Sequence, residues 1–123
     1  MSPLRLMFAA AASLAATAAA AQTPVQHVEL RSYAYGPKAI RLAAGKPVTL
    51  HFMNRAGKAH DFTAPRFFAA ARILSGSAPR GQIELAAGQT AAITLVPSAG
   101  TFKVHCGHPF HKQLGMSAVI EVR

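Results

Sequence analysis

Short stretches in which apolar residues alternate with other residues, separated by glycine or proline turns, constrain the fold of this chain more than any other feature. In residues 48–53, Val48, Leu50 and Phe52 occupy every second position, so an extended backbone would place all three side chains on one face. The same period of two recurs in residues 26–32, 39–43, 83–85, 91–96, 101–106 and 116–122. Many short alternating segments with turns between them predict an all-β sandwich.

The first 21 residues do not fit that domain. Arg5 gives a positive start, an alanine-rich apolar run follows, and Ala19 and Ala21 form the small-x-small pattern at which signal peptidases cut. The run has few large aliphatic side chains, which argues against a transmembrane anchor. We therefore expect a cleaved signal peptide over residues 1–21, export to the periplasm, and one domain over residues 22–123 that is large enough to bury a core.

The chain has a single cysteine, Cys106, in a loop that also holds histidines and a methionine. An exported protein with one cysteine forms no internal disulfide, and a free thiol in an oxidising compartment is a liability unless something holds it. Metal coordination would hold it, whereas a plain core cysteine leaves the neighbouring donors unexplained. A blue copper centre uses two imidazoles and a thiolate in a plane, with a weak thioether on the axis. The matching donors in this chain are His60, Cys106, His111 and Met116.

The spacing within the loop favours His111 over His108 as the second imidazole. A metal loop must bring several side chains to one point, so residues close together in the chain make poor co-ligands. His111 lies five residues after Cys106 and five before Met116, and a proline and a glycine between them help the chain to turn. His108 follows the cysteine by only two residues. We therefore predict that His108 is not a ligand and lies at the surface or hydrogen-bonds within loop 106–116.

The alternation also sorts the other histidines. Cys106 shares a strand face with Val104, so its sulfur is expected to point toward the core. His105 then points to the opposite surface and is a poor co-ligand for the same metal. His51 falls on the face opposite the apolar residues of its strand and is expected at the surface, and His27, near the start of the domain, carries no functional signal.

These residues resemble the cupredoxin family, most of all its small plastocyanin-like and auracyanin-like members. The resemblance rests on residues 54–62 and 106–116, and it covers about residues 28–122. It implies a Greek-key β-sandwich with one copper ion per chain that cycles between Cu(I) and Cu(II). In that family the residue after the first histidine ties the two ligand loops together, and Asp61 fills that position.

One segment interrupts the β pattern. Residues 64–74 begin with Ala-Pro and continue with an alanine-rich run, and proline in the first turn followed by good helix formers is typical of a helix. We expect one short helix here, ended by Gly76 and Pro79. Phe67 or Phe68 would either cover the metal site from one side or pack in the core, and the sequence leaves both open.

The chain is strongly basic, with 13 lysines and arginines against 4 acidic residues and a formal net charge of +9. The cations are scattered and do not alternate with aromatic residues, which argues against nucleic-acid binding. A basic surface favours a redox partner with an acidic docking surface and peripheral contact with an anionic membrane. We expect a monomer whose partner docks near the exposed edge of His111, on an apolar patch ringed by cations and formed by Pro109, Phe110 and Leu114 beside Lys112.

The donor set favours single-electron transfer over catalysis. Thiolate, imidazole and thioether ligands suit both Cu(I) and Cu(II). No open coordination position or paired base is evident, since Glu29, Glu84 and Glu121 lie on strands with no histidine partner indicated by spacing. Zinc also binds cysteine and histidine, but the soft thioether of Met116 favours copper, and a dinuclear copper centre would need a second cysteine.

Two other hypotheses stay open at this point. His105 and His108 flank the cysteine, and extra imidazoles beside a copper site can form a transfer position or a second binding position. The protein would then be a periplasmic copper-handling protein, a scavenger, carrier or resistance factor. A cupredoxin fold that holds metal only structurally is the third hypothesis. The number of copper ions bound and a reversible redox couple distinguish the first two.

Overall fold

The computed structural model describes residues 3–4, 9–12, 22–109, 111 and 114–123. The expected signal peptide, residues 1–21, lies mostly outside this part of the chain, and so do Phe110 and Lys112 of the expected docking patch. Within the described residues, no helix has the length and apolar character needed to cross a membrane.

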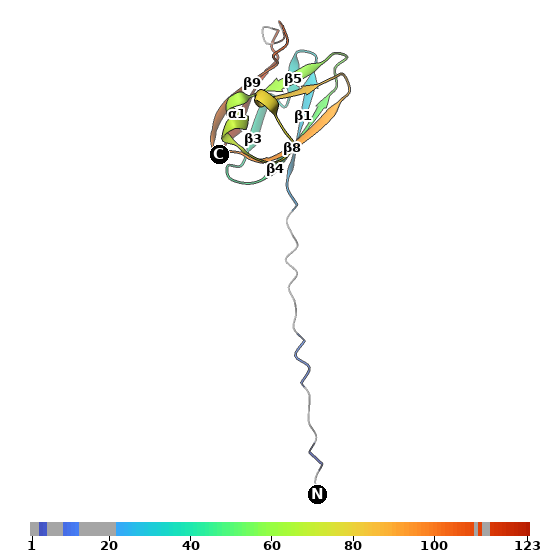
Figure 1. Ribbon diagram of the computed structural model, residues 1–123, viewed down its shortest axis with the longest axis vertical. Coiled ribbons are helices and arrows are strands. Elements are labelled where there is room, and N and C mark those ends of the chain that lie inside the picture. Colours follow the sequence, from blue (N-terminus) through green and yellow to red (C-terminus); the bar gives the residue numbers. More distant parts are fainter. Residues whose placement is uncertain (1–2, 5–8, 13–21, 110, 112–113) are drawn as a thin grey trace.

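The described residues form ten strands, one α-helix and one short 3-10 helix. In chain order these are β1 (Val25–Arg31), β2 (Ala34–Gly36), β3 (Ala39–Leu42), β4 (Val48–Asn54), β5 (His60–Thr63), α1 (Pro65–Ala70), β6 (Arg72–Ser75), η1 (Pro79–Gly81), β7 (Gln82–Leu85), β8 (Thr90–Val96), β9 (Gly100–His105) and β10 (Ser117–Val122). The first sheet has the strand order β2-β1-β4-β8-β6 and the second sheet has the order β3-β10-β9-β5-β7. The two sheets form the sandwich seen in Figure 1, which confirms the predicted all-β fold.

Alternation along the strands builds the core between the two sheets. In β4, Val48, Leu50 and Phe52 are buried, and the side chains between them are partly exposed. The neighbouring strand β8 contributes Ile93 and Leu95 to the same interior. Burial of each large apolar side chain contributes about 1.5–3 kcal/mol. A slip of one residue would turn this face to solvent, so the core fixes the register of the strands.

Pairing between β5 and β9 brings distant parts of the sequence to one end of the second sheet. The two strands are antiparallel, and Thr63 pairs with His105. The chain that leaves β9 after His105 therefore runs alongside Asp61 and His60 at the start of β5. The loop between β9 and β10 rises at this end of the sandwich, where Figure 1 draws it in red.

The helix is shorter than the sequence predicts. Helix α1 ends at Ala70, and Ala71 already has an extended backbone with φ −82° and ψ 152°. The predicted helical residues that follow instead form β6, which pairs antiparallel with β8 through Ile73 and Leu95. The expectation of a helix through Leu74 was wrong because the unpaired backbone groups at the edge of β8 attract a strand, and this pairing outweighs local helix propensity.

The sequence left open whether the two phenylalanines of α1 cover the metal site or pack in the core, and the structure shows that they pack in the core. Phe67 and Phe68 are both buried. Phe67 lies 5.6 Å from Phe102 and Phe68 lies 6.2 Å from Phe62, measured between ring centroids in edge-on contacts. Helix α1 therefore closes the core beside the second sheet.

Candidate metal centre

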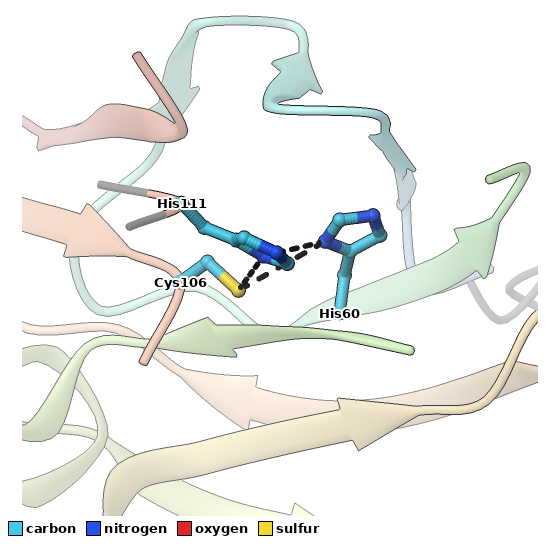
Figure 2. A group of neighbouring side chains, drawn as sticks. All are labelled: His60, Cys106 and His111. Carbon is cyan, nitrogen blue, oxygen red and sulfur yellow. Dashed lines mark hydrogen bonds between the residues drawn. The ribbon is translucent and has the colours of Figure 1, made fainter. Parts of the chain in front are cut away.

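Three of the predicted ligands meet at one end of the sandwich (Figure 2). His60 opens β5, Cys106 directly follows β9, and His111 lies in the loop between β9 and β10. The two Nδ1 atoms of the histidines are 3.1 Å apart. The Sγ atom of Cys106 lies 3.3 Å from Nδ1 of His111 and 4.0 Å from Nδ1 of His60.

The spacing of these three donor atoms fits a single metal ion. Metal–nitrogen and metal–sulfur bonds of about 2.0–2.3 Å, as zinc makes, require donors roughly 3.5–4 Å apart in a trigonal plane. Two of the observed separations, 3.1 and 3.3 Å, lie slightly below that range, and the third, 4.0 Å, lies at its upper end. Two imidazoles and one thiol that converge without an intervening side chain can close on one ion by small rotations.

The backbone of Met116, the fourth predicted ligand, is hydrogen-bonded to two of the other three predicted ligands, Cys106 and His111. Its N–H donates to the carbonyl of His111 at 2.9 Å, and its carbonyl accepts from the N–H of Cys106 at 3.3 Å. The side chain is fully buried. The loop therefore closes on itself, and its last residue lies beside its first.

Asp61 ties the two ligand loops together, as the family resemblance implied. Its Oδ1 accepts hydrogen bonds from the N–H of Gly107 at 2.8 Å and from the hydroxyl of Thr63 at 2.6 Å. Its own N–H points at the sulfur of Cys106 at 3.5 Å, and its carbonyl accepts a hydrogen bond from the Tyr35 hydroxyl. Asp61 is only 1% exposed, so these contacts fix the position of the sulfur from inside the protein.

Burial acts in opposite directions on the two kinds of ligand. Desolvation lowers the pKa of His60, and the nearby imidazoles of His111 and His108 lower it further. His60 is therefore held in the neutral form that coordinates metals. Desolvation raises the pKa of the Cys106 thiol, against the lowering effect of backbone hydrogen bonds from Asp61 and His108. A metal that binds here must displace the thiol proton.

Comparison with known proteins places the chain in a family. The sequence matches the cupredoxin-like domain family over residues 4–120. The chain belongs to the cupredoxin family. No curated protein sequence matches it as a relative. Together with the family, the convergent histidines and cysteine of this cupredoxin indicate one copper site.

Solved cupredoxin structures have the same fold. Dithionite-reduced auracyanin from Roseiflexus castenholzii is 20% identical, with a TM-score of 0.63, and the match covers 85% of this chain and 99% of that one. Auracyanin B is 22% identical, with a TM-score of 0.62, and covers 85% and 93%. A multicopper oxidase from Campylobacter jejuni is 12% identical, with a TM-score of 0.63, over 84% of this chain but 31% of the oxidase. At these identities the likeness establishes the fold.

His108 of this cupredoxin has partners that the sequence did not predict. Its Nε2 lies 3.2 Å from a carboxylate oxygen of Glu84 on β7 and 3.7 Å from one of Asp61 on β5. Within its own loop, its carbonyl accepts a hydrogen bond from the N–H of His111 at 3.3 Å, as the sequence predicted. Its ring stacks on that of His111, with centroids 5.4 Å apart. Asp61, Cys106 and His108 also form a second group whose donor atoms all lie within 4.8 Å of one another.

Two tyrosines near the site escaped the sequence analysis. The ring of Tyr33 contacts that of His111 edge-on, with centroids 5.1 Å apart, and Tyr33 is 39% exposed. Tyr35 is buried in β2 and donates its hydroxyl to the carbonyl of Asp61. The sequence carried little signal for either residue, because Tyr33 lies in a turn with φ +58° and Tyr35 lies in a three-residue strand too short to be recognised by alternation.

Proposed function

We propose that this protein is a periplasmic mononuclear type 1 copper protein that transfers single electrons between redox partners. The observation that carries the proposal is the convergence of two imidazole Nδ1 atoms and one thiol sulfur within 4.8 Å in a cupredoxin fold. The proposed ligands are His60, Cys106, His111 and Met116. Bound copper supplies a one-electron Cu(I)/Cu(II) couple for which this soft and borderline donor set is suited.

The protein's own contribution is a rigid, dry ligand frame. His60, Cys106 and Met116 are each at most 2% exposed, so water is kept from most of the site. Asp61 holds the sulfur and the loop amide of Gly107 together, which limits movement of the thiolate. A frame that holds its ligands in place suits both oxidation states and keeps the rearrangement on electron transfer small.

Partner docking would use the exposed edge of His111. His111 is partly exposed, and Tyr33 and Leu114 beside it are exposed apolar residues, with Leu114 58% exposed. Such a patch favours a short contact through which an electron reaches the metal by way of the imidazole. The net charge of +9 supports a partner with an acidic docking surface or an anionic membrane surface nearby. We propose that the protein acts as a monomeric carrier and not as an enzyme.

The test is to add Cu(II) to the metal-free protein and record optical and paramagnetic resonance spectra. We expect an intense visible sulfur-to-copper charge-transfer band at one copper per chain. The Cys106→Ser variant should lose this band while its far-ultraviolet circular dichroism is unchanged. A folded wild-type protein that binds Cu(II) at the site without colour would refute the proposal.

Copper handling is the second candidate, and the group of Asp61, Cys106 and His108 favours it. Asp61 and His108 place a second set of donor atoms around the sulfur of Cys106. This second set offers a position through which an ion enters or leaves. The distinguishing measurement is copper transfer to a competing chelator under anaerobic conditions. Fast release that slows in the His108→Ala variant supports handling, whereas slow release together with a reversible redox couple supports electron transfer.

Export supports either function, and it rests on the expected leader. Cleavage after Ala21 would give a mature chain that starts at Gln22, just before the first strand at Val25. N-terminal sequencing of the protein recovered from the periplasmic fraction tests this. A chain that retains its first 21 residues in the cytoplasm would contradict it.

A further inference from the structure

A second pair of histidines lies on the other sheet of the sandwich. His27 of β1 and His51 of β4 are direct partners in the parallel pairing of these two strands. Their ring centroids are 5.4 Å apart, with the ring planes at 69°. Residues 28 and 52, which follow them, point into the core. The two imidazoles therefore share the outer face of the first sheet.

Met53 supplies a third donor on the same face. It lies two residues after His51 in β4, and it is paired with Glu29, two residues after His27 in β1. Side chains two positions apart in a strand share a face, and the unbranched methionine chain reaches its neighbours easily. On the other side, β8 places the small side chain of Ala92 opposite His51.

Glu29 does not compete for this position. Its carboxylate is bound by Arg31 at 2.6 Å and by Arg55 at 2.8 Å. These guanidinium groups hold the pKa of Glu29 below its usual value, so the carboxylate stays charged and paired. This leaves the imidazoles of His27 and His51 and the thioether of Met53 as available donors. Thioether and imidazole ligands without a carboxylate favour Cu(I) over zinc and over hard cations.

The distance between the two rings permits a common ion if each ring turns a nitrogen toward it. A metal–nitrogen bond of about 2.0–2.1 Å puts an imidazole centroid roughly 3 Å from the ion. Two centroids 5.4 Å apart then subtend an angle of roughly 120° at the ion, which lies within the trigonal to tetrahedral range. We propose that His27, His51 and Met53 form a second copper site, selective for Cu(I), on the outer face of β1 and β4.

This site is separate from the centre at Cys106, which lies on the second sheet. It needs no thiolate, so it would fill whether or not the first centre is loaded. The full chain would then bind one more Cu(I) than the Cys106 centre accounts for. The additional imidazoles that the sequence placed beside the cysteine are not involved.

The test is an anaerobic Cu(I) titration of the mature protein against a chromophoric chelator, compared between variants. The double variant His27→Gln/His51→Gln should bind one equivalent fewer than wild type. The matched control His105→Gln, also a partly exposed strand histidine, should bind as many as wild type. Equal stoichiometry in wild type and the double variant overturns the proposal, as does equal loss in the control.

Two further readouts keep the test independent of the first centre. Cu(I) is diamagnetic, so the imidazole resonances of His27 and His51 should shift in the NMR spectrum as the second equivalent is added. Unshifted resonances overturn the site. The double variant should retain the visible band with Cu(II), which shows that it is folded. If wild type gives no such band, the electron-transfer proposal fails while the difference in Cu(I) count still decides this one.

The thioether is tested by Met53→Leu, which keeps the volume and apolar character of the side chain. We expect a loss of Cu(I) affinity at this site with Zn(II) affinity unchanged, because only the soft ion gains from sulfur. Unchanged Cu(I) affinity overturns the assignment of Met53 and with it the selectivity for Cu(I).

Discussion

Replacing Asn54 by alanine should destabilise the protein by about 2–4 kcal/mol, because a fully satisfied buried amide would be lost. Asn54 ends β4 and is 0% exposed. Its Nδ2 donates to the carbonyls of Lys58 at 2.8 Å, Leu85 at 3.1 Å and Ala86 at 3.2 Å. Its Oδ1 accepts from the N–H of Ala56 at 2.9 Å. One side chain thus joins the loop that leads to His60 with the turn between β7 and β8.

The magnitude follows from which partners water can reach. Lys58 and Ala86 are exposed, so water can replace the amide at their carbonyls. Ala56 and Leu85 are buried, and each of their freed polar groups costs about 1–2 kcal/mol, in the lower part of the range for an unsatisfied buried group. For a domain of this size, 2–4 kcal/mol lowers Tm by roughly 10–25 °C.

The assay is urea denaturation of the metal-free protein, because bound metal would add its own stabilisation. Gln89→Ala is the matched control: its Oε1 accepts from the N–H of Ala86 in the same turn, but the bond is exposed. The control should lose less than about 1 kcal/mol. If the Asn54→Ala variant were as stable as this control, the buried hydrogen bonds of Asn54 would not be what joins the loop to the turn.

Two further changes have definite outcomes. Gly81→Ala should destabilise by at least about 1–2 kcal/mol, since Gly81 has φ +71° and an added Cβ would lie 3.0 Å from the Cβ of Pro65 at the start of α1; a Tm equal to wild type would contradict this. Asp61→Asn keeps the acceptor atom but removes a buried negative charge within 4.8 Å of the Cys106 sulfur, which destabilises Cu(II) relative to Cu(I). We expect the reduction potential to rise by roughly 100 mV in a redox titration, and a fall would refute the electrostatic reasoning.

The sandwich could be predicted because period-two alternation reports burial directly, and β4 shows it at full strength. The strand that carries the first proposed ligand could not. In β5, His60, Asp61 and Phe62 are buried in succession, so no alternation appears. Two buried polar residues interrupt the binary pattern there, and sequence reasoning fails where buried polar groups replace core residues. The predicted helix failed at β6 for a different reason. The strand with which β6 pairs, β8, lies far along the chain, so the local sequence gives no sign of the pairing.

The proposed ligands were accessible to sequence reasoning because their chemistry resides in residue type and in spacing within one loop. Their surroundings were not, because they depend on strand register. Asp61 pairs with Glu84 across β5 and β7, and this register alone gives His108 two carboxylates to contact. His27 and His51 likewise read as isolated surface residues until the parallel register of β1 and β4 makes them neighbours.

The two proposed copper sites differ in burial, and we therefore expect them to exchange copper at different rates. At the first, His60 and Cys106 are almost fully covered, so an incoming ligand reaches the copper less easily. At the second, His27 is exposed on a strand face, and an incoming ligand can displace an imidazole without moving the backbone. Slow exchange suits an ion that stays and changes charge, whereas fast exchange suits an ion that is captured and passed on. A competing chelator should therefore remove Cu(I) in two phases, and the His27→Gln/His51→Gln variant should lose the fast one.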